Sequence, residues 1–312
     1  MDLTVRPYRD SDVDSLLACD HAVDGRFGAH PGLTAEDVRI WVRRMHDPET
    51  DSRVVIAPDG SVVAYGLVGL PSDGGVRCGV FGEVHPRWIG RGIGRDLLAW
   101  QLRRARDLRD EVAPGSPWTL WSGCYADDAD TLRLHERFGL QPARYWFSMA
   151  ASTAKRADVP MPDGFRLTDG GSVDPHRLYV AHMEAFQDHF GFERESFDEF
   201  MRDYIGSEAY RPELSRIAYD GDEIAAYVIC YDEADPKTVL VGDVGTRSAW
   251  RRRGLASALL SDVLAAADAA GRPDARLNVD ASSAVGAVGV YERAGFAVES
   301  RRVSVTIALD AL

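Results

Sequence analysis

Apolar residues follow two spacings that alternate along this chain. An apolar, β-branched run that ends at Thr246 is typical of a strand, whereas Leu255, Ala258, Leu259 and Val263 recur at the spacing of one helix face. Clusters of glycine and proline separate such segments. The pattern predicts an α/β (α+β mixed) protein, in which a mixed sheet carries helices on its faces.

The same order of elements is predicted twice. In the first half we expect strands at 3–8, 52–57, 61–70, 76–84, 118–124 and 141–150, with helices at 10–20, 34–44, 92–108 and 129–138. In the second half we expect strands at 165–167, 216–219, 223–231, 238–246, 275–279 and 298–308, with helices at 173–186, 197–205, 254–269 and 283–294.

Three short segments of the first half recur in the second half, in the same order and at nearly constant spacing. The matched pairs are IAPDG at 56–60 and IAYDG at 217–221, WIGRG at 88–92 and WRRRG at 250–254, and HERFG at 135–139 and YERAG at 291–295. Such self-similarity indicates a tandem duplication of one domain of about 150 residues. We therefore predict domains at 1–151 and 165–312, joined by a proline-containing linker at 152–164.

Composition narrows the function. The chain has 36 basic and 49 acidic residues and a net charge of −13, which argues against nucleic acid as a partner and is compatible with a cationic small substrate. Its four cysteines have no metal-ligand spacing, so we expect no metal site and no catalytic thiol. A polar N-terminus and the lack of an apolar run of about 18 residues predict a cytoplasmic protein without a membrane partner.

The segment between Thr246 and Leu255 is the strongest candidate for a binding site. A strand leads into a turn that carries Arg251, Arg252 and Arg253, and a helix opens at Gly254. The first N–H groups of a helix lack internal partners and lie at the positive end of its dipole, so they bind anions. Neither a P-loop motif nor a complete GxGxxG motif is present, since Arg95 stands where the third glycine would be.

Both halves share instead a glycine-x-glycine/alanine opening of this helix, Gly254-Leu255-Ala256 and Gly92-Ile93-Gly94. This loop, together with the downstream YERAGF segment at 291–296, resembles the GNAT superfamily of acyl-CoA-dependent N-acyltransferases. The doubled pattern resembles its tandem members, which have a mycothiol synthase-like organisation. The resemblance implies two GNAT folds, each with a mostly antiparallel sheet that splays at a coenzyme A site.

The resemblance also implies the residues that bind acetyl-CoA, the expected co-substrate. Pantetheine would lie along Val244, Gly245 and Thr246, and the pyrophosphate on the loop that follows. The implied loop contacts in the second half are Arg251, Arg252, Arg253, Gly254, Leu255 and Ala256, with Ser283 in the place of a frequent asparagine. In the first half they are Val84, Gly90, Arg91, Gly92, Ile93 and Gly94.

The two halves differ at positions that matter for chemistry. The family usually carries a basic or amide side chain where the first half has Ile89, and a tyrosine where it has His135; the second half has Arg251 and Tyr291. Tyr291 is the candidate acid for the departing thiolate, and packing of the last helix is its alternative role. We therefore expect the second half to be catalytic and the first to be degenerate or non-catalytic.

Two parts of the reaction remain to be assigned, the base and the acceptor. Asp243, on the strand before the loop, is the candidate base that removes a proton from an attacking primary amine, unless strand alternation turns it away from the site. Carboxylates of the segment at 182–204 are candidate contacts for a cationic amine, or a solvated helix face. We expect a small-molecule amine acceptor and a monomer or homodimer. A coenzyme A-binding sensor with decayed sites and a mycothiol-pathway acetyltransferase are the alternatives.

Overall fold

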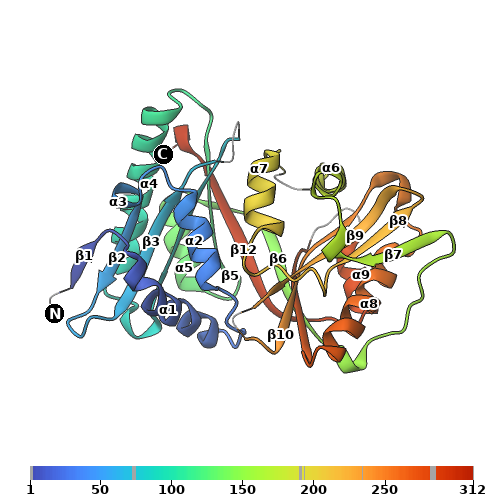
Figure 1. Cartoon of the computed structure of the whole chain (residues 1–312). Coiled ribbons are helices and arrows are strands. Elements are labelled where there is room, and N and C mark those ends of the chain that lie inside the picture. The colour runs from blue at the N-terminus through green and yellow to red at the C-terminus, as the bar shows by residue number, and fades with distance from the viewer. Residues whose placement is uncertain are drawn as a thin grey trace. The chain divides into compact units, whose positions relative to one another are not determined.

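The computed structural model describes residues 3–71, 75–189, 192, 194–233, 235–281 and 286–311. The chain divides into two compact units, each of which is described by itself (Figure 1). Unit 1 contains Met1–Tyr145 and Ser300–Leu312, and unit 2 contains Trp146–Glu299. Among the described residues, no helix has both the length and the apolar character needed to span a bilayer.

Unit 1 is a sheet with helices on both faces (Figure 1). Its strands have the order β1-β2-β3-β4-β5-β12, with bounds β1 Thr4–Arg6, β2 Ser52–Ile56, β3 Val62–Gly69, β4 Arg77–Val84, β5 Thr119–Tyr125 and β12 Ala297–Ala308. Its helices are α1 Val13–Arg26, α2 Ala35–Arg43, α3 Pro48–Asp51, α4 Ile93–Val112 and α5 Ala129–Arg137. Successive strand residues serve opposite faces: Val54 packs with the α1 and α2 cluster, and Val55 with the α4 cluster.

Unit 2 repeats this plan. Its strands have the order β6-β11-β10-β9-β8-β7, with bounds β6 Gln141–Ser152, β7 Phe165–Asp169, β8 Arg216–Asp220, β9 Glu223–Asp232, β10 Thr238–Thr246 and β11 Asp274–Asp280. Its helices are α6 Pro175–Phe186, α7 Phe197–Phe200, which a π-helix at Met201–Ile205 continues, α8 Leu255–Ala269 and α9 Ala287–Arg293. Tyr227 faces the α6 and α7 cluster, and Val228 faces the α8 and α9 cluster. The predicted fold class is confirmed.

The boundaries of the units differ from the contiguous halves that the repeat suggested. β12, at the C-terminal end of the chain, pairs antiparallel with β5 of unit 1 from Arg302↔Tyr125 to Ala308↔Thr119. β6, which follows the first half, pairs with β11 of unit 2 from Asp274↔Ser152 to Asp280↔Trp146. The two halves therefore exchange their last strands, and the linker residues after Ser152 belong to unit 2. A strand pattern does not specify its partner, which is why the sequence predicted closed halves.

In each unit one strand leaves its parallel neighbour early. β10 pairs with β11 only over Thr238–Leu240, and then continues along β9 to Thr246. β4 pairs with β5 only over Arg77–Gly79, and then continues along β3 to Val84. Every second residue of an antiparallel pair directs its N–H and C=O away from the partner, so the far side of β10 offers peptide groups to an extended ligand. This is the splay that the family resemblance implied.

Candidate functional site

The loop between β10 and α8 has a backbone that fits the anion-binding role predicted for it. A short 3₁₀ turn, Ser248–Trp250, is followed by Arg251 at φ −62° and ψ 154°, Arg252 at φ 64° and Gly254 at φ 83° and ψ −1°. Gly254 is the N-terminal cap of α8, so the free N–H groups of the first helical turn begin at Leu255. Positive φ suits Gly254, whereas at Arg252 it costs about 1 kcal/mol.

The matching loop of unit 1 has nearly the same backbone. Ile89 lies at φ −63° and ψ 153°, Gly90 at φ 80°, and Gly92 at φ 83° and ψ −6°. At Gly94 an added Cβ would lie 3.5 Å from Val84 and from Leu134, which is ordinary contact. Both units therefore present a helix N-terminus in a similar cradle, and the fit to a pyrophosphate extends to both.

The three arginines of the unit 2 loop point in different directions. The Arg251 guanidinium turns back to α6 and β10, where it donates to the Ala185 and Thr246 carbonyls and to Asp188. Arg253 lies over the Phe165 ring, 4.6 Å from its centroid. Arg252 is exposed and forms no ion pair with any residue that the structure describes. Of the three arginines predicted to contact phosphate, only Arg252 has a side chain that no other described residue holds.

The other predicted loop residues of both units lie where the chain pattern placed them. Val244 packs partly on the α8 core, Leu255 is buried in it, and Thr246 ends β10. In unit 1, Ile93 is buried at the start of α4, and the Arg91 guanidinium lies 4.5 Å from the centroid of the Trp88 ring. Ser283 lies outside the described residues.

Two glycines of β10 make room for aromatic rings. A Cβ at Gly242 would collide with the Tyr231 ring, and a Cβ at Gly245 would collide with the Tyr227 ring. Both tyrosines belong to the α6 and α7 face, and the Tyr227 hydroxyl lies 2.9 Å from Nδ1 of His182. The VGDVG segment is thus glycine-rich because β9 side chains cross it. The rings of Tyr227 and Tyr231, which the sequence did not predict, lie beside Asp243.

Asp243 lies on the face of β10 that α6 and α7 cover, beside the Tyr231 ring. The Tyr231 hydroxyl donates to its Oδ2 at 3.2 Å. Burial raises the pKa of Asp243 to about 7; the hydrogen bond from Tyr231 opposes that rise, and the nearby Glu195 charge adds to it. A bulge between Val241 and Asp243 sets this direction, because an extra residue in one strand reverses the alternation of its side chains. A carboxylate with this pKa suits a general base at neutral pH.

Tyr291 lies on α9 and is 8% exposed, with its ring 6.2 Å from that of Phe296 in an edge-to-face arrangement. Burial first, and then the negative charge of Asp243, raise the pKa of its hydroxyl above the usual range. The phenol is therefore protonated at neutral pH, as a proton donor must be. Because the Asp243 charge acts on it, the two predicted catalytic residues lie in one electrostatic environment.

His135, which takes the place of Tyr291 in unit 1, has a different character. It is 6% exposed, and its Nδ1 is buried without a hydrogen-bond partner. Burial lowers the pKa of His135 to about 4, so the imidazole is neutral at physiological pH. A neutral imidazole of this kind is a poor proton donor to a thiolate.

Unit 1 holds a cluster of charged side chains that the sequence reasoning did not assemble. The Arg302 guanidinium, carried by the exchanged strand β12, lies 3.6 Å from Glu83 and 3.8 Å from Asp24. It also stacks on Tyr125, at 4.5 Å from the ring centroid. Burial raises the pKa of Glu83 to about 8, Arg302 opposes this shift, and Asp20 and Asp24 add to it.

Most carboxylates of the predicted acceptor helices are already paired. Glu184 accepts from Arg247 at 2.7 Å, Asp188 accepts from Arg251 at 3.0 Å, and Asp203 lies 3.2 Å from Arg202. Glu199 accepts from the backbone N–H of Ser196, the N-terminal cap of α7, and so completes its capping box. Glu193 lies outside the described residues. This surface is therefore less open to a cationic acceptor than its sequence suggested.

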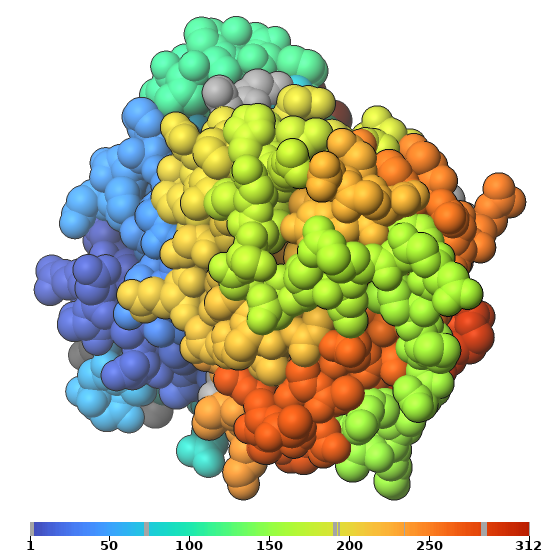
Figure 2. All heavy atoms as spheres, turned by 45° about the vertical axis from the view of Figure 1, so that its right-hand side comes forward, coloured from blue at the N-terminus to red at the C-terminus, as the bar shows by residue number. Residues whose placement is uncertain are grey.

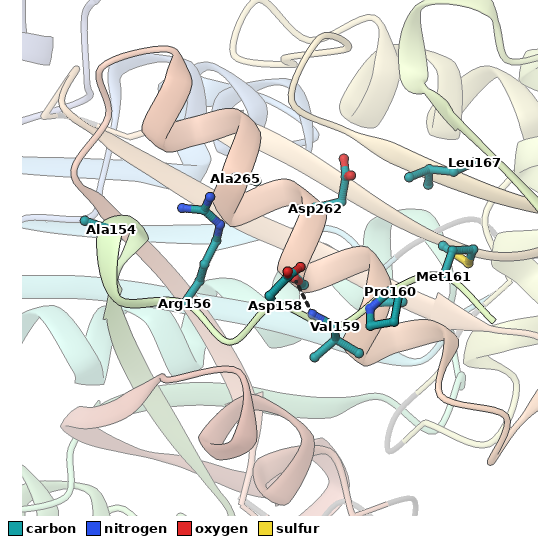
Figure 3. A pocket seen from close by; sticks show the side chains of 11 residues that line it. Ala154, Arg156, Asp158, Val159, Pro160, Met161, Leu167, Asp262 and Ala265 are labelled. Atoms are coloured by element: carbon teal, nitrogen blue, oxygen red, sulfur yellow. Dashed lines mark hydrogen bonds between the residues drawn. The ribbon is translucent and has the colours of Figure 1, made fainter.

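A cavity of about 470 Å³ lies on unit 2 outside this site (Figure 3). The linker forms one wall, with Arg156, Asp158 and Met161, and α8 forms another, with Asp262 and Ala265. Ser261 fixes the linker there, because its Oγ accepts from the Val159 N–H and donates to the Ala157 carbonyl. Figure 2 shows this side of unit 2, with lime-green linker atoms beside the orange of α8. No β10 residue lines the cavity.

Known proteins resemble the chain in family and in fold. Residues 176–296 match the model of the acetyltransferase (GNAT) family. A GCN5-related N-acetyltransferase from Sphaerobacter thermophilus superposes with a TM-score of 0.80 at 28% identity, covering 98% of this chain and 96% of that one. A tandem GNAT protein from the clavulanic acid biosynthesis pathway superposes with a TM-score of 0.73 at 21% identity, covering 99% of each chain. Among curated proteins, none matches the sequence.

Proposed function

The chain belongs to the GNAT superfamily as a tandem acyltransferase, and from this premise we propose that unit 2 transfers an acetyl group from acetyl-CoA to the primary amine of a small molecule. The observation that carries the proposal is the position of Asp243. Its carboxyl group lies on the splayed strand, has a pKa of about 7, and raises the pKa of the Tyr291 phenol. A base and an acid thus flank one opening of the sheet.

The β10–α8 loop supports binding of the donor. The N–H groups of Leu255 and Ala256 begin α8 and suit the pyrophosphate, and the exposed Arg252 adds positive charge. The outward peptide groups of Val244–Thr246 suit an extended pantetheine. When bound, acetyl-CoA would supply an acetyl group activated as a thioester.

Asp243 and Tyr291 divide the proton transfers. A C–N bond forms between the amine and the acetyl carbon while the C–S bond breaks, and the carboxylate of Asp243 takes the proton that the nitrogen loses. The hydroxyl of Tyr291 gives its proton to the departing sulfur, so that an amide and a free thiol result. Exchange with water then returns Asp243 to the anion and Tyr291 to the phenol. A backbone N–H near Thr246 would stabilise the developing oxyanion.

The test follows free thiol while the protein turns over acetyl-CoA with a panel of amines. Asp243→Asn should lower kcat/KM by about 10²–10⁴-fold, and Tyr291→Phe by a smaller factor with unchanged coenzyme A affinity. Because Asp243 acts in its deprotonated form, kcat/KM of the natural protein should rise as the pH increases through about 7. Glu83→Gln, which removes the carboxylate on the splayed strand of unit 1, is the control and should leave the rate unchanged.

A coenzyme A-binding sensor would give a different result. Calorimetry would then show coenzyme A binding, but no amine would release thiol, and that result would overturn the proposed acyl transfer. Equal loss of activity in Glu83→Gln and Asp243→Asn would overturn the assignment of catalysis to unit 2.

A further inference from the structure

We propose that the acceptor of unit 2 is an amine that carries a flat aromatic ring a short distance from its nitrogen, rather than a polyamine or an amino sugar. The inference rests on the proposed function and deepens it. It comes from a row of rings in contact with one another, which runs from the exchanged strand β6 over α6 to the π-helix, beside Tyr227 and Tyr231.

The row is continuous from ring to ring. Trp146 on β6 lies 6.2 Å from His189, which lies 5.5 Å from Phe186 on α6. Phe186 stacks on His182 at 4.7 Å, and His182 lies 5.0 Å from Tyr204 on the π-helix. Trp146, Phe186 and Tyr204 are partly exposed, and His189 is exposed, so the row offers ring surface to a ligand.

Two links join this row to the reacting groups. His182 lies 2.9 Å from the hydroxyl of Tyr227, the ring that Gly245 of β10 admits. Tyr204 packs in one cluster with Tyr227 and Tyr231, and the Tyr231 hydroxyl donates to Asp243 at 3.2 Å. A π-helix turn, as at Met201–Ile205, is frequent at functional sites.

Unit 1 shows that the fold does not require this aromatic lining. The repeat and the strand registers match His182 to Asp20, Phe186 to Asp24, Gly245 to Glu83 and Trp146 to Arg302. Unit 1 has the equivalent of the contact between Tyr227 and His182, since the Tyr65 hydroxyl donates to Asp20 of α1 at 2.5 Å. At these positions unit 1 has three carboxylates and one guanidinium, and unit 2 has rings or glycine. The two units therefore share a backbone arrangement but present side chains that suit ligands of different chemistry.

Charge in unit 2 agrees with a single ammonium group. Glu184, Asp188 and Asp203 are held by arginines, as described above, so the helices offer little to a second or third ammonium. Asp243 and the nearby Glu195 are carboxylates beside the rings. An amine with one charge and one ring meets both features, since rings attract a cation over their faces as well as another ring.

The experiment measures kcat/KM with tryptamine, 2-phenylethylamine, n-hexylamine, spermidine and glucosamine in the full-length protein with acetyl-CoA. The two aryl amines should exceed the other three by about tenfold, the factor expected from one aromatic contact. Trp146→Ala should raise KM for tryptamine by about tenfold with little change in kcat, and Trp146→Phe should restore most of the affinity. Tyr145→Ala, at the exposed neighbour on β6, should change neither value.

The outcomes separate the two proposals. Thiol release with spermidine or glucosamine, at rates equal to or above those of the aryl amines, would overturn the aromatic acceptor and leave acyl transfer intact. Equal effects of Trp146→Ala and Tyr145→Ala would also overturn it, because the row would then not line the acceptor site. Failure of every amine to release thiol would instead refute the proposed function.

Discussion

Units 1 and 2 share a frame but differ in what it surrounds. In both units one strand leaves its parallel neighbour early, and a residue with positive φ lies two positions before the glycine cap. In both, a tyrosine hydroxyl also forms a hydrogen bond with a side chain of the first long helix. Beside the splayed strand and the first long helix, unit 1 has Glu83 and Arg302, and unit 2 has Asp243 and a row of rings. The duplication therefore kept the backbone of the loop and changed the chemistry beside it.

The side chains of the exchanged strands sharpen this contrast. The first residue of β12 that pairs with β5 is Arg302, which brings a guanidinium into unit 1, and the first residue of β6 that pairs with β11 is Trp146, which brings an indole into unit 2. Arg302 puts positive charge next to Glu83 and Asp24, where an amine would otherwise meet carboxylates. Trp146 adds no charge. Each half of the chain thus contributes one of these residues to the unit that is built mainly from the other half.

The largest expected effect comes from changing the glycine cap in one of the two similar loops. Gly254→Asp places a carboxylate beside the proposed pyrophosphate, at a φ of 83° that costs a residue with a Cβ about 1 kcal/mol. We expect acetyl-CoA affinity in unit 2 to fall by roughly a hundredfold, and acetyl transfer to fall with it. Calorimetry with coenzyme A measures the affinity. Gly92→Asp is the matched change in unit 1 and should leave the transfer rate intact; an inactive Gly92→Asp protein would assign catalysis to both units.

A smaller effect concerns the charge cluster of unit 1. Arg302→Met leaves Glu83 and Asp24 near one another without their cation, so we expect the free energy of unfolding at pH 8 to fall by about 1–2 kcal/mol, less than for a fully buried pair because Arg302 is 39% exposed. Urea denaturation measures it. Adding Glu83→Gln to Arg302→Met should recover most of the loss. A double variant as unstable as the single one would show that packing on Tyr125, and not charge, is what Arg302 contributes.

The smallest effect concerns Arg252. Its φ of 64° is unusual for a residue with a Cβ, and unit 1 has Gly90 at this position. Arg252→Gly should raise stability by a few tenths to about 1 kcal/mol through relief of strain, and should weaken coenzyme A binding about threefold through loss of one exposed charge. Thermal unfolding and calorimetry check the two parts. Unchanged coenzyme A affinity would mean that Arg252 is kept for another reason.

The sequence predicted most of the local structure of the site. The repeat, the strand before the loop and the helix that opens at Gly254 are confirmed, because backbone geometry there depends on neighbouring residues. The direction of the Arg251 side chain was not predicted. Its guanidinium meets Asp188 and the Ala185 carbonyl, which are distant in sequence and depend on how α6 packs against β10.

By itself, the sequence determined that one domain was duplicated, that a helix opens at Gly92 in one copy and at Gly254 in the other, and that Asp243 lies on the strand before the second loop. These follow from residue order and from backbone preferences that act within a few residues. Only the tertiary structure decided that the last strands are exchanged, and that burial raises the pKa of Asp243 to about 7. It also decided that a row of rings lies where unit 1 has charges. Strand partners, desolvation and ring stacking depend on contacts between distant segments, which a local pattern does not encode.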